Sequence, residues 1–131
     1  MHTIVQPKGW PRPKGYANGV LAQGKMLFVA GQVGWNEKEQ FESDDFVAQT
    51  AQALTNIVAI LHEGGARPEH LVRMTWYVTE KGEYLDRLAD IGKVYKRIIG
   101  AVYPAMSLVQ VAGLVEVGAK LEIEATAVIP A

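Results

Sequence analysis

Two glutamates near the end of the chain stand in a pattern that suits acid–base chemistry. Glu122 and Glu124 alternate with apolar residues from Leu121 to Ile129, which places both side chains on one face of a predicted strand. A carboxylate in an apolar cleft can have a raised pKa and act as a general acid or base. The alternative is that Glu122 faces solvent or forms an ion pair at an interface. The same alternative applies to Glu124, which lies on the same face.

Tyr16 and three tryptophans are the other side chains that suit a ligand site. Tyr16 follows Gly15 in a predicted loop, where its phenol either closes over a ligand or packs as an ordinary half-buried tyrosine. Trp10, Trp35 and Trp76 suit the lining of a cleft for a ring-bearing ligand. The alternative is packing in the core or at an interface, and the apolar neighbours of Trp76 on its strand favour this for that residue.

Several classes of chemistry lack their residues in this chain. There is no Cys, which excludes disulfides, thiolate metal sites and cysteine nucleophiles. The histidines at positions 2, 62 and 70 do not have the spacing of metal ligands. The glycines at positions 31 and 34 lack the Gly-Lys-Ser/Thr ending of a phosphate loop. We therefore expect neither a metal ion nor another cofactor.

Length and charge limit the fold and the partners. The 131 residues predict a single domain over positions 1–131. The 13 Lys and Arg residues are scattered and the net charge is −1, whereas a nucleic-acid surface is usually concentrated and basic, so a nucleic-acid partner is disfavoured. The chain has neither a signal-peptide pattern nor the roughly 18 apolar residues of a membrane span. We expect a cytoplasmic protein without a membrane partner.

Hydrophobic periodicity predicts two helices and five strands, or six strands if residues 3–5 form another. Short apolar runs on both sides of Gly24-Lys25 predict a hairpin. Ser43 is the expected N-cap of the first helix, and Gly100 is the expected stop of the second. In chain order, the predicted elements are strands 20–23 and 26–30, helix 44–63, strand 71–79, helix 84–98, and strands 106–112 and 120–129.

This order of elements indicates a two-layer α+β domain in which both helices cover one face of a sheet. The other face of the sheet carries too many apolar and aromatic residues to remain in water as one large patch. Packing against copies of the same chain is the simplest way to cover that face. We therefore expect a homo-oligomer.

Five segments spread over the chain share their pattern with a known family. They are Gly15–Val20 (GYANGV), Phe28–Gln32 (FVAGQ), Gln49–Ile57 (QTAQALTNI), Tyr103–Val109 (YPAMSLV) and Leu121–Ala127 (LEIEATA). On these segments the chain resembles the Rid family, the RidA/YjgF/UK114 group. The resemblance implies a chorismate-mutase-like fold with a mixed sheet and two helices on one face. It also implies a homotrimer whose sheets line a central barrel, with small-molecule clefts between subunits.

The resemblance implies two catalytic residues and a set of binding positions. The archetypes hydrolyse reactive enamines and imines to ketoacids and ammonia. Glu122 matches the glutamate thought to activate the attacking water, and Tyr16 matches a tyrosine of the cleft. Backbone amides near Gly31 and Val109 are expected to steady developing charge. The full set of expected substrate-binding positions is Gly31, Met106, Leu108, Val109, Ala30, Trp35 and Gly92.

Three polar side chains of the archetypes are replaced in this chain. Met106 occupies the position of the Arg that grips the substrate carboxylate, Ala30 that of a Ser, and Gly92 that of an Asn. Charged hydrogen bonds contribute about 1.5–3 kcal/mol, so we expect binding of a small carboxylate to weaken about ten- to a hundredfold. We therefore expect a substrate other than 2-aminoacrylate.

Three functions remain open on these residues. The first is hydrolytic deamination of another enamine or imine, in the breakdown of aromatic or amino compounds. The second is a trimer that binds a metabolite without turning it over, and the third is an RNA-directed endoribonuclease or translation inhibitor. Whether Arg12, Lys14 or Arg73 replaces the missing Arg in the cleft also remains open.

Overall fold

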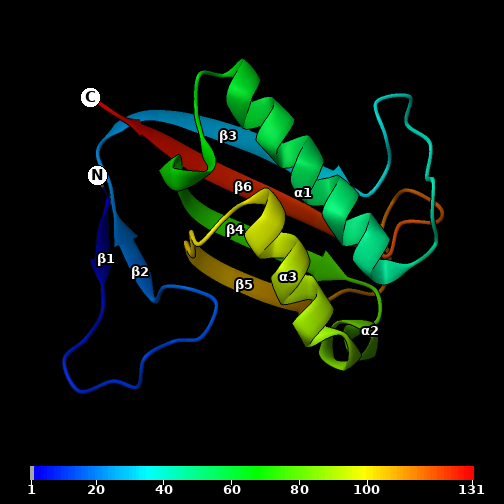
Figure 1. The fold of residues 1–131 in the computed structure, drawn as a ribbon, viewed down its shortest axis with the longest axis horizontal. Helices are drawn as coiled ribbons and strands as arrows, with labels where there is room; N and C mark the ends of the chain where they lie inside the picture. The colour runs from blue at the N-terminus through cyan, green and yellow to red at the C-terminus, as the bar shows by residue number, and fades with distance from the viewer. Residues whose placement is uncertain (1) are drawn as a thin grey trace.

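The computed structural model describes residues 2–131 and contains a four-stranded mixed sheet with helices on one of its faces (Figure 1). The strand order is β3-β6-β4-β5, in which only the β4–β5 pair is parallel. The predicted two-layer α+β fold is therefore confirmed. In chain order, the elements are β1 (Thr3–Val5), β2 (Gly19–Leu21), β3 (Gly24–Val33), α1 (Phe46–Glu63), the 3-10 turn η1 (Pro68–His70), β4 (Leu71–Val78), α2 (Lys81–Asp86), α3 (Leu88–Ile98), β5 (Ala105–Gln110) and β6 (Leu121–Pro130).

The helix-covered face of the sheet holds the hydrophobic core. Successive side chains of a strand point to opposite faces, so alternate residues of β4 and β6 lie under the helices. Met74 and Val78 of β4 and Leu121 and Ile123 of β6 have no exposed surface, and Leu54 of α1 packs in the same core. No helix among residues 2–131 has the length and apolarity of a membrane span.

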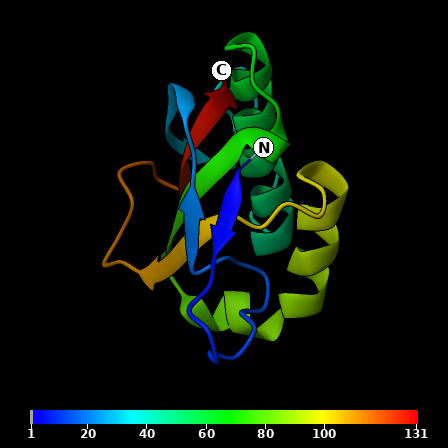
Figure 2. The same ribbon diagram turned by 90° about the vertical axis from the view of Figure 1, so that its left-hand side faces the viewer.

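The opposite face of the sheet is open, because all three helices lie on one side of it (Figure 2). Apolar residues remain exposed there, including Phe28 at 69% and Met26 at 59% of their surface, both on β3. Large apolar side chains in water are unfavourable, and a contiguous group of them commonly marks an interface.

The predicted hairpin around Gly24-Lys25 is wrong. The run 20–23 does not pair with the next strand, because Gly19–Leu21 pairs with Thr3–Val5 in a separate two-stranded ribbon. Gly24 and Lys25 lie inside β3, where they pair with Pro130 and Ile129 of β6. Both apolar runs do form strands, but β3 pairs with β6, which is far away in the sequence, and not with the run that precedes it.

Two predicted helix boundaries also differ. The N-cap of α1 is Asp45 rather than Ser43, since the Asp45 carboxylate accepts a hydrogen bond from the Ala48 amide at 3.0 Å. The predicted second helix is two helices, separated at Arg87, which has a non-helical backbone. Arg87 instead donates to Asp45 at 3.0 Å and Asp90 at 2.9 Å. The Ala48 amide and the Arg87 guanidinium hold the pKa of Asp45 below its usual value.

Candidate functional site

A pocket of about 440 Å³ opens between the helix layer, β5 and the loop that joins β1 to β2. We call it the Met106 pocket. Its volume lies within the range of about 300–1,000 Å³ that is usual for small-molecule sites, and its lining is mostly aromatic and apolar. The lining residues are Lys14, Gly15, Tyr16, Trp76, Tyr84, Leu88, Ile91, Gly92, Tyr95, Tyr103, Met106, Ser107 and Leu108.

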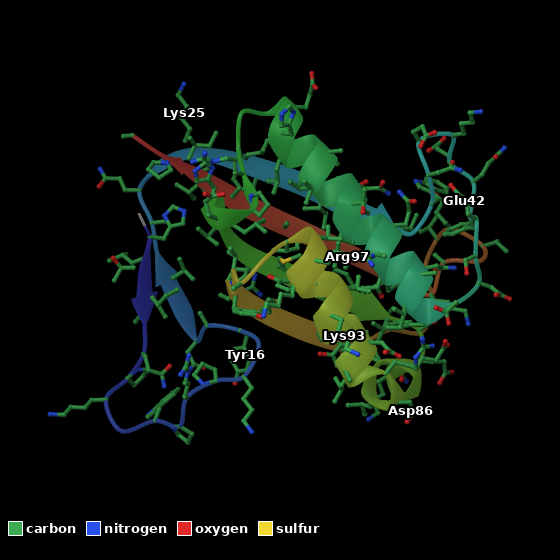
Figure 3. All side chains as sticks on the ribbon, in the orientation of Figure 1. Tyr16, Lys25, Glu42, Asp86, Lys93 and Arg97 are labelled. Carbon is green, nitrogen blue, oxygen red and sulfur yellow. The ribbon has the colours of Figure 1, made fainter. Side chains whose placement is uncertain are left out.

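Tyr16 reaches this pocket because the residue after it is fixed to the edge of the sheet. The Ala17 amide donates to the Pro104 carbonyl at 3.0 Å, and Ala17 forms a parallel bridge with Ala105 of β5. Gly15 has a φ of +78°, a left-handed conformation that glycine adopts without strain and that turns the chain just before Tyr16. Figure 3 shows Tyr16 on this loop, close to β5. Tyr16 is 42% exposed and lies at the mouth of the pocket.

Two stacked tyrosines form another part of the wall. The rings of Tyr95 and Tyr103 are nearly parallel, with centroids 5.5 Å apart. The Tyr95 hydroxyl donates to the Val102 carbonyl at 2.5 Å, which ties α3 to the segment that enters β5. Burial raises the pKa of Tyr95 well above its usual value, so the hydroxyl stays protonated and keeps this bond.

The floor of the pocket is apolar. Met106 and Leu108 lie on the helix-covered face of β5 and pack against the core. Gly92 of α3 leaves open space, since an added Cβ would meet no atom within 4 Å. Among the described residues that line the pocket, Lys14 is the only Lys or Arg. Lys14 also lines an adjoining hollow of about 900 Å³, which it shares with Arg12.

The second group of expected residues lies on the open face of the sheet. A register shift between Val29 and Gln32 interrupts the pairing of β3 with β6, and Gly31 lies within it. A Cβ added to Gly31 would overlap the Glu122 carboxylate, so this carboxylate rests directly against the Gly31 backbone. Only a residue without a side chain leaves that place free. Val109, 44% exposed, points to the same open face from β5.

A tyrosine–glutamate pair lies beside Glu122 and was not expected from the sequence. The Tyr77 hydroxyl donates to Glu124 at 2.6 Å. This hydrogen bond, burial and the negative charges of Glu124 and Glu122 raise the pKa of Tyr77, against the opposing effect of Arg73. Arg73 precedes the buried Met74 on β4 and does not line the Met106 pocket, so it belongs to the open face. The antiparallel register of β4 and β6 brings Tyr77 beside the two glutamates. This register cannot be predicted from a local sequence pattern.

The three tryptophans do not form one aromatic lining. Trp76 is 4% exposed and forms part of the Met106 pocket, whereas Trp10 is 60% exposed and lines the adjoining hollow. Trp35 packs on Phe41 with ring centroids 5.7 Å apart, outside both. The aromatic wall comes instead from the tyrosines at positions 84, 95 and 103. Two of these, Tyr84 and Tyr95, lie within the predicted helix 84–98.

Comparison with known proteins gives the family of this fold and site. A sequence profile described as Endoribonuclease L-PSP matches residues 11–129. A Rid protein of unknown function from Yersinia pestis, YyfB, superimposes with a TM-score of 0.85 at 31% identity, over 98% of each chain. The chain belongs to the Rid/YjgF family.

Two other relatives are known with a substrate or a ligand. The 2-iminobutanoate/2-iminopropanoate deaminase of Escherichia coli is 33% identical over 116 residues, which are 86% of each chain. The Escherichia coli protein TdcF, solved with bound serine, is 32% identical with a TM-score of 0.68, over 97% of this chain and 98% of that one. At such identities the family and the fold are shared.

Within the single chain of this Rid protein, the expected site residues are divided between the two faces of the sheet. No three His, Asp or Glu side chains among residues 2–131 gather as metal ligands would. Aromatic and apolar groups are on the helix side, and the carboxylates are on the open side. The helix-side group is Tyr16, Gly92, Met106 and Leu108, and the open-face group is Ala30, Gly31, Val109 and Glu122.

Proposed function

We propose that this Rid protein is a homotrimeric enzyme that hydrolyses an enamine or imine metabolite other than 2-aminoacrylate. The observation that carries the proposal is the Glu122 carboxylate, held against Gly31 on a sheet face that no helix covers. The Met106 pocket receives the apolar part of the substrate. The Escherichia coli deaminase relative supports the reaction class.

Trimerisation brings the two divided groups of residues into one cleft. The open face presents Phe28 and Met26 to solvent, and burial of such residues favours association. When this face packs on a second copy, Glu122 of one subunit meets the Met106 pocket of its neighbour. Sedimentation at micromolar concentration tests this arrangement, and a stable monomer would contradict it.

The reaction needs one water and one general base. Glu122 takes a proton from the water as its oxygen attacks the imine carbon, and passes this proton to the imine nitrogen. Glu122 then relays the hydroxyl proton of the adduct to the departing nitrogen, which regenerates the carboxylate. The resulting carbinolamine loses ammonia as the carbon–oxygen double bond forms, so an imine and water become a carbonyl compound and ammonia. Backbone amides near Gly31 and Val109 stabilise developing negative charge, and Tyr16 covers the ligand.

Ammonia release from 2-aminoacrylate and from ring-bearing imines tests the proposal. Wild type is expected to be inactive on 2-aminoacrylate, and Met106→Arg is expected to gain this activity because it restores a bidentate carboxylate partner. On an accepted imine, Glu122→Gln is expected to lower kcat about 10²–10⁴-fold. Glu124→Gln, on the same face of β6, is the matched control.

Two results would contradict the proposal. Wild-type turnover of 2-aminoacrylate would mean that another cation replaces the Arg. Unchanged turnover in Glu122→Gln would remove Glu122 from the mechanism.

A second candidate is a trimer that binds a metabolite without converting it. It is favoured by the loss of three polar groups of the archetypes, at Ala30, Gly92 and Met106. The Escherichia coli relative TdcF was solved with a bound amino acid, serine. A ligand that raises Tm and is recovered unchanged after incubation would support this candidate, and turnover of that ligand would exclude it.

A further inference from the structure

Trp76 carries a buried polar atom that the rest of the protein does not satisfy. Among residues 2–131, its Nε1 is the only buried side-chain nitrogen or oxygen without a hydrogen-bond partner. Trp76 itself is 4% exposed. Buried donors in native proteins are nearly always paired, and an orphan one calls for a specific explanation such as a missing ligand.

The surroundings of Trp76 explain why no protein group satisfies this donor. On the two neighbouring strands it pairs with Leu108 and Ile123, which have no side-chain acceptor. The Tyr84 ring makes an edge contact with the Trp76 ring, and the two ring centroids are 6.3 Å apart. No hydroxyl oxygen of the wall, including those of Tyr84 and Tyr95, accepts a hydrogen bond from Nε1. The indole forms part of the lining of the Met106 pocket, but Nε1 itself has almost no exposed surface. An occupant of this pocket is the natural source of an acceptor once a neighbouring wall side chain shifts to admit it.

The rest of the pocket defines the shape and charge of that occupant. Tyr95 and Tyr103 are stacked, and with Trp76 and Tyr84 they offer flat aromatic surfaces that suit a planar ring. Lys14 is the one cation of the lining, and it takes part in none of the ion pairs among the described residues. A free ammonium beside an aromatic pocket suits a ring that carries an acidic group.

We propose that Trp76 is a specificity-determining residue of the Met106 pocket. Its Nε1–H donates to an acceptor atom in or on a planar ring, while Lys14 binds an acidic group of the same molecule. The substrate class is therefore a ring-bearing acid with a ring acceptor. As a statement about substrate this rests on the proposed function, but the binding it describes does not require turnover.

Pyridine carboxylates and benzoate test the role of the indole, because they differ only in a ring nitrogen that accepts a hydrogen bond. Binding is measured by titration calorimetry with all three pyridine isomers. Wild type is expected to bind at least one isomer about tenfold more tightly than benzoate. Trp76→Phe is expected to remove this preference and to leave benzoate affinity within about twofold. Trp10→Phe, outside the pocket, is expected to keep the preference.

Lys14 is tested with the same ligands. Lys14→Gln is expected to weaken benzoate and the pyridine acids by equal factors, roughly three- to tenfold, because it removes charge attraction without touching the ring acceptor. The affinity of the wild type for these acids should fall as salt is added, since exposed charges are screened. The difference in affinity between the wild type and Lys14→Gln should therefore shrink. Unchanged affinity in Lys14→Gln would remove Lys14 from the proposal.

A measurement on the wild type covers the case in which Trp76→Phe does not fold. The indole N–H resonance of Trp76, assigned with Trp10→Phe and Trp35→Phe, is expected to move with the preferred pyridine acid and to move less with benzoate. Equal wild-type affinity for benzoate and every pyridine isomer, or a preference that survives in Trp76→Phe, would overturn the proposal. These are binding results, so absent ammonia release would count against the proposed function alone.

Discussion

The two faces of the β3-β6-β4-β5 sheet carry opposite chemistry. On the helix side, Ile123 of β6 is completely buried in the core. On the open side, its neighbours Glu122 and Glu124 lie in a polar cluster with Tyr77. Because adjacent residues of a strand point to opposite faces, one ten-residue strand supplies both the core and the candidate chemistry. Substitutions one position apart should therefore separate stability from activity.

The largest expected effect on stability comes from Ile123→Ala. It removes a side chain with no exposed surface from the core, so we expect the free energy of unfolding to fall by about 2–5 kcal/mol. Glu122→Gln, one residue away, is nearly isosteric and on the open face, so its change should stay within about 0.5 kcal/mol. Urea unfolding measures both. Equal losses would contradict the division between the faces.

A smaller effect is expected from Gly31→Ala. The new Cβ would overlap the Glu122 carboxylate, which must then rotate away. Because this carboxylate is the far end of a flexible side chain, we expect the low end of overpacking, a loss of about 1 kcal/mol in the free energy of unfolding. In a Glu122→Ala background the loss should disappear, since nothing remains to clash. A double-mutant cycle that shows no coupling between positions 31 and 122 would mean that the clash with Glu122 is not what disfavours a side chain at position 31.

The smallest expected effect is a pH dependence on the open face. The hydrogen bond to Glu124 raises the pKa of Tyr77 above the unfolded value. Its contribution to stability is therefore complete below about pH 10 and is lost as the pH rises through the folded pKa. The phenolate absorbance of wild type minus Tyr77→Phe measures this pKa. Glu124→Gln should return it toward its usual value, and an unchanged titration would contradict the pairing.

Local sequence patterns predicted the elements well and their neighbours poorly. The amphipathic period located α1, and alternation located β4 and β6, because these signals arise within one segment. The pairing of β1 with β2 and of β3 with β6 depends on residues far apart in the chain, so the local turn signal at Gly24 misled. The break at Arg87 likewise depends on its tertiary contact with Asp45.

The candidate site shows the same limit. The resemblance placed Met106 and Glu122 in one cleft, and their assignment to opposite faces requires the register of β4, β5 and β6. Tyr84 and Tyr95 carried no signal of a pocket, because aromatic residues on the apolar face of a predicted helix are more often core. The orphan Nε1 of Trp76 is a property of three-dimensional surroundings and has no counterpart in the sequence.

The bridge between Ala17 and Ala105 has a consequence for solubility. β5 is the edge strand of the sheet, and a bare edge presents unpaired amide and carbonyl groups to any other extended chain. Ala17 forms a bridge with Ala105, the first residue of β5, and the Ala17 amide donates to the carbonyl of Pro104. The loop that places Tyr16 at the pocket mouth therefore also covers one end of the β5 edge, which would otherwise be open to pairing with another strand. A chain cut after this loop would lose the pocket mouth and gain a site for strand-to-strand aggregation.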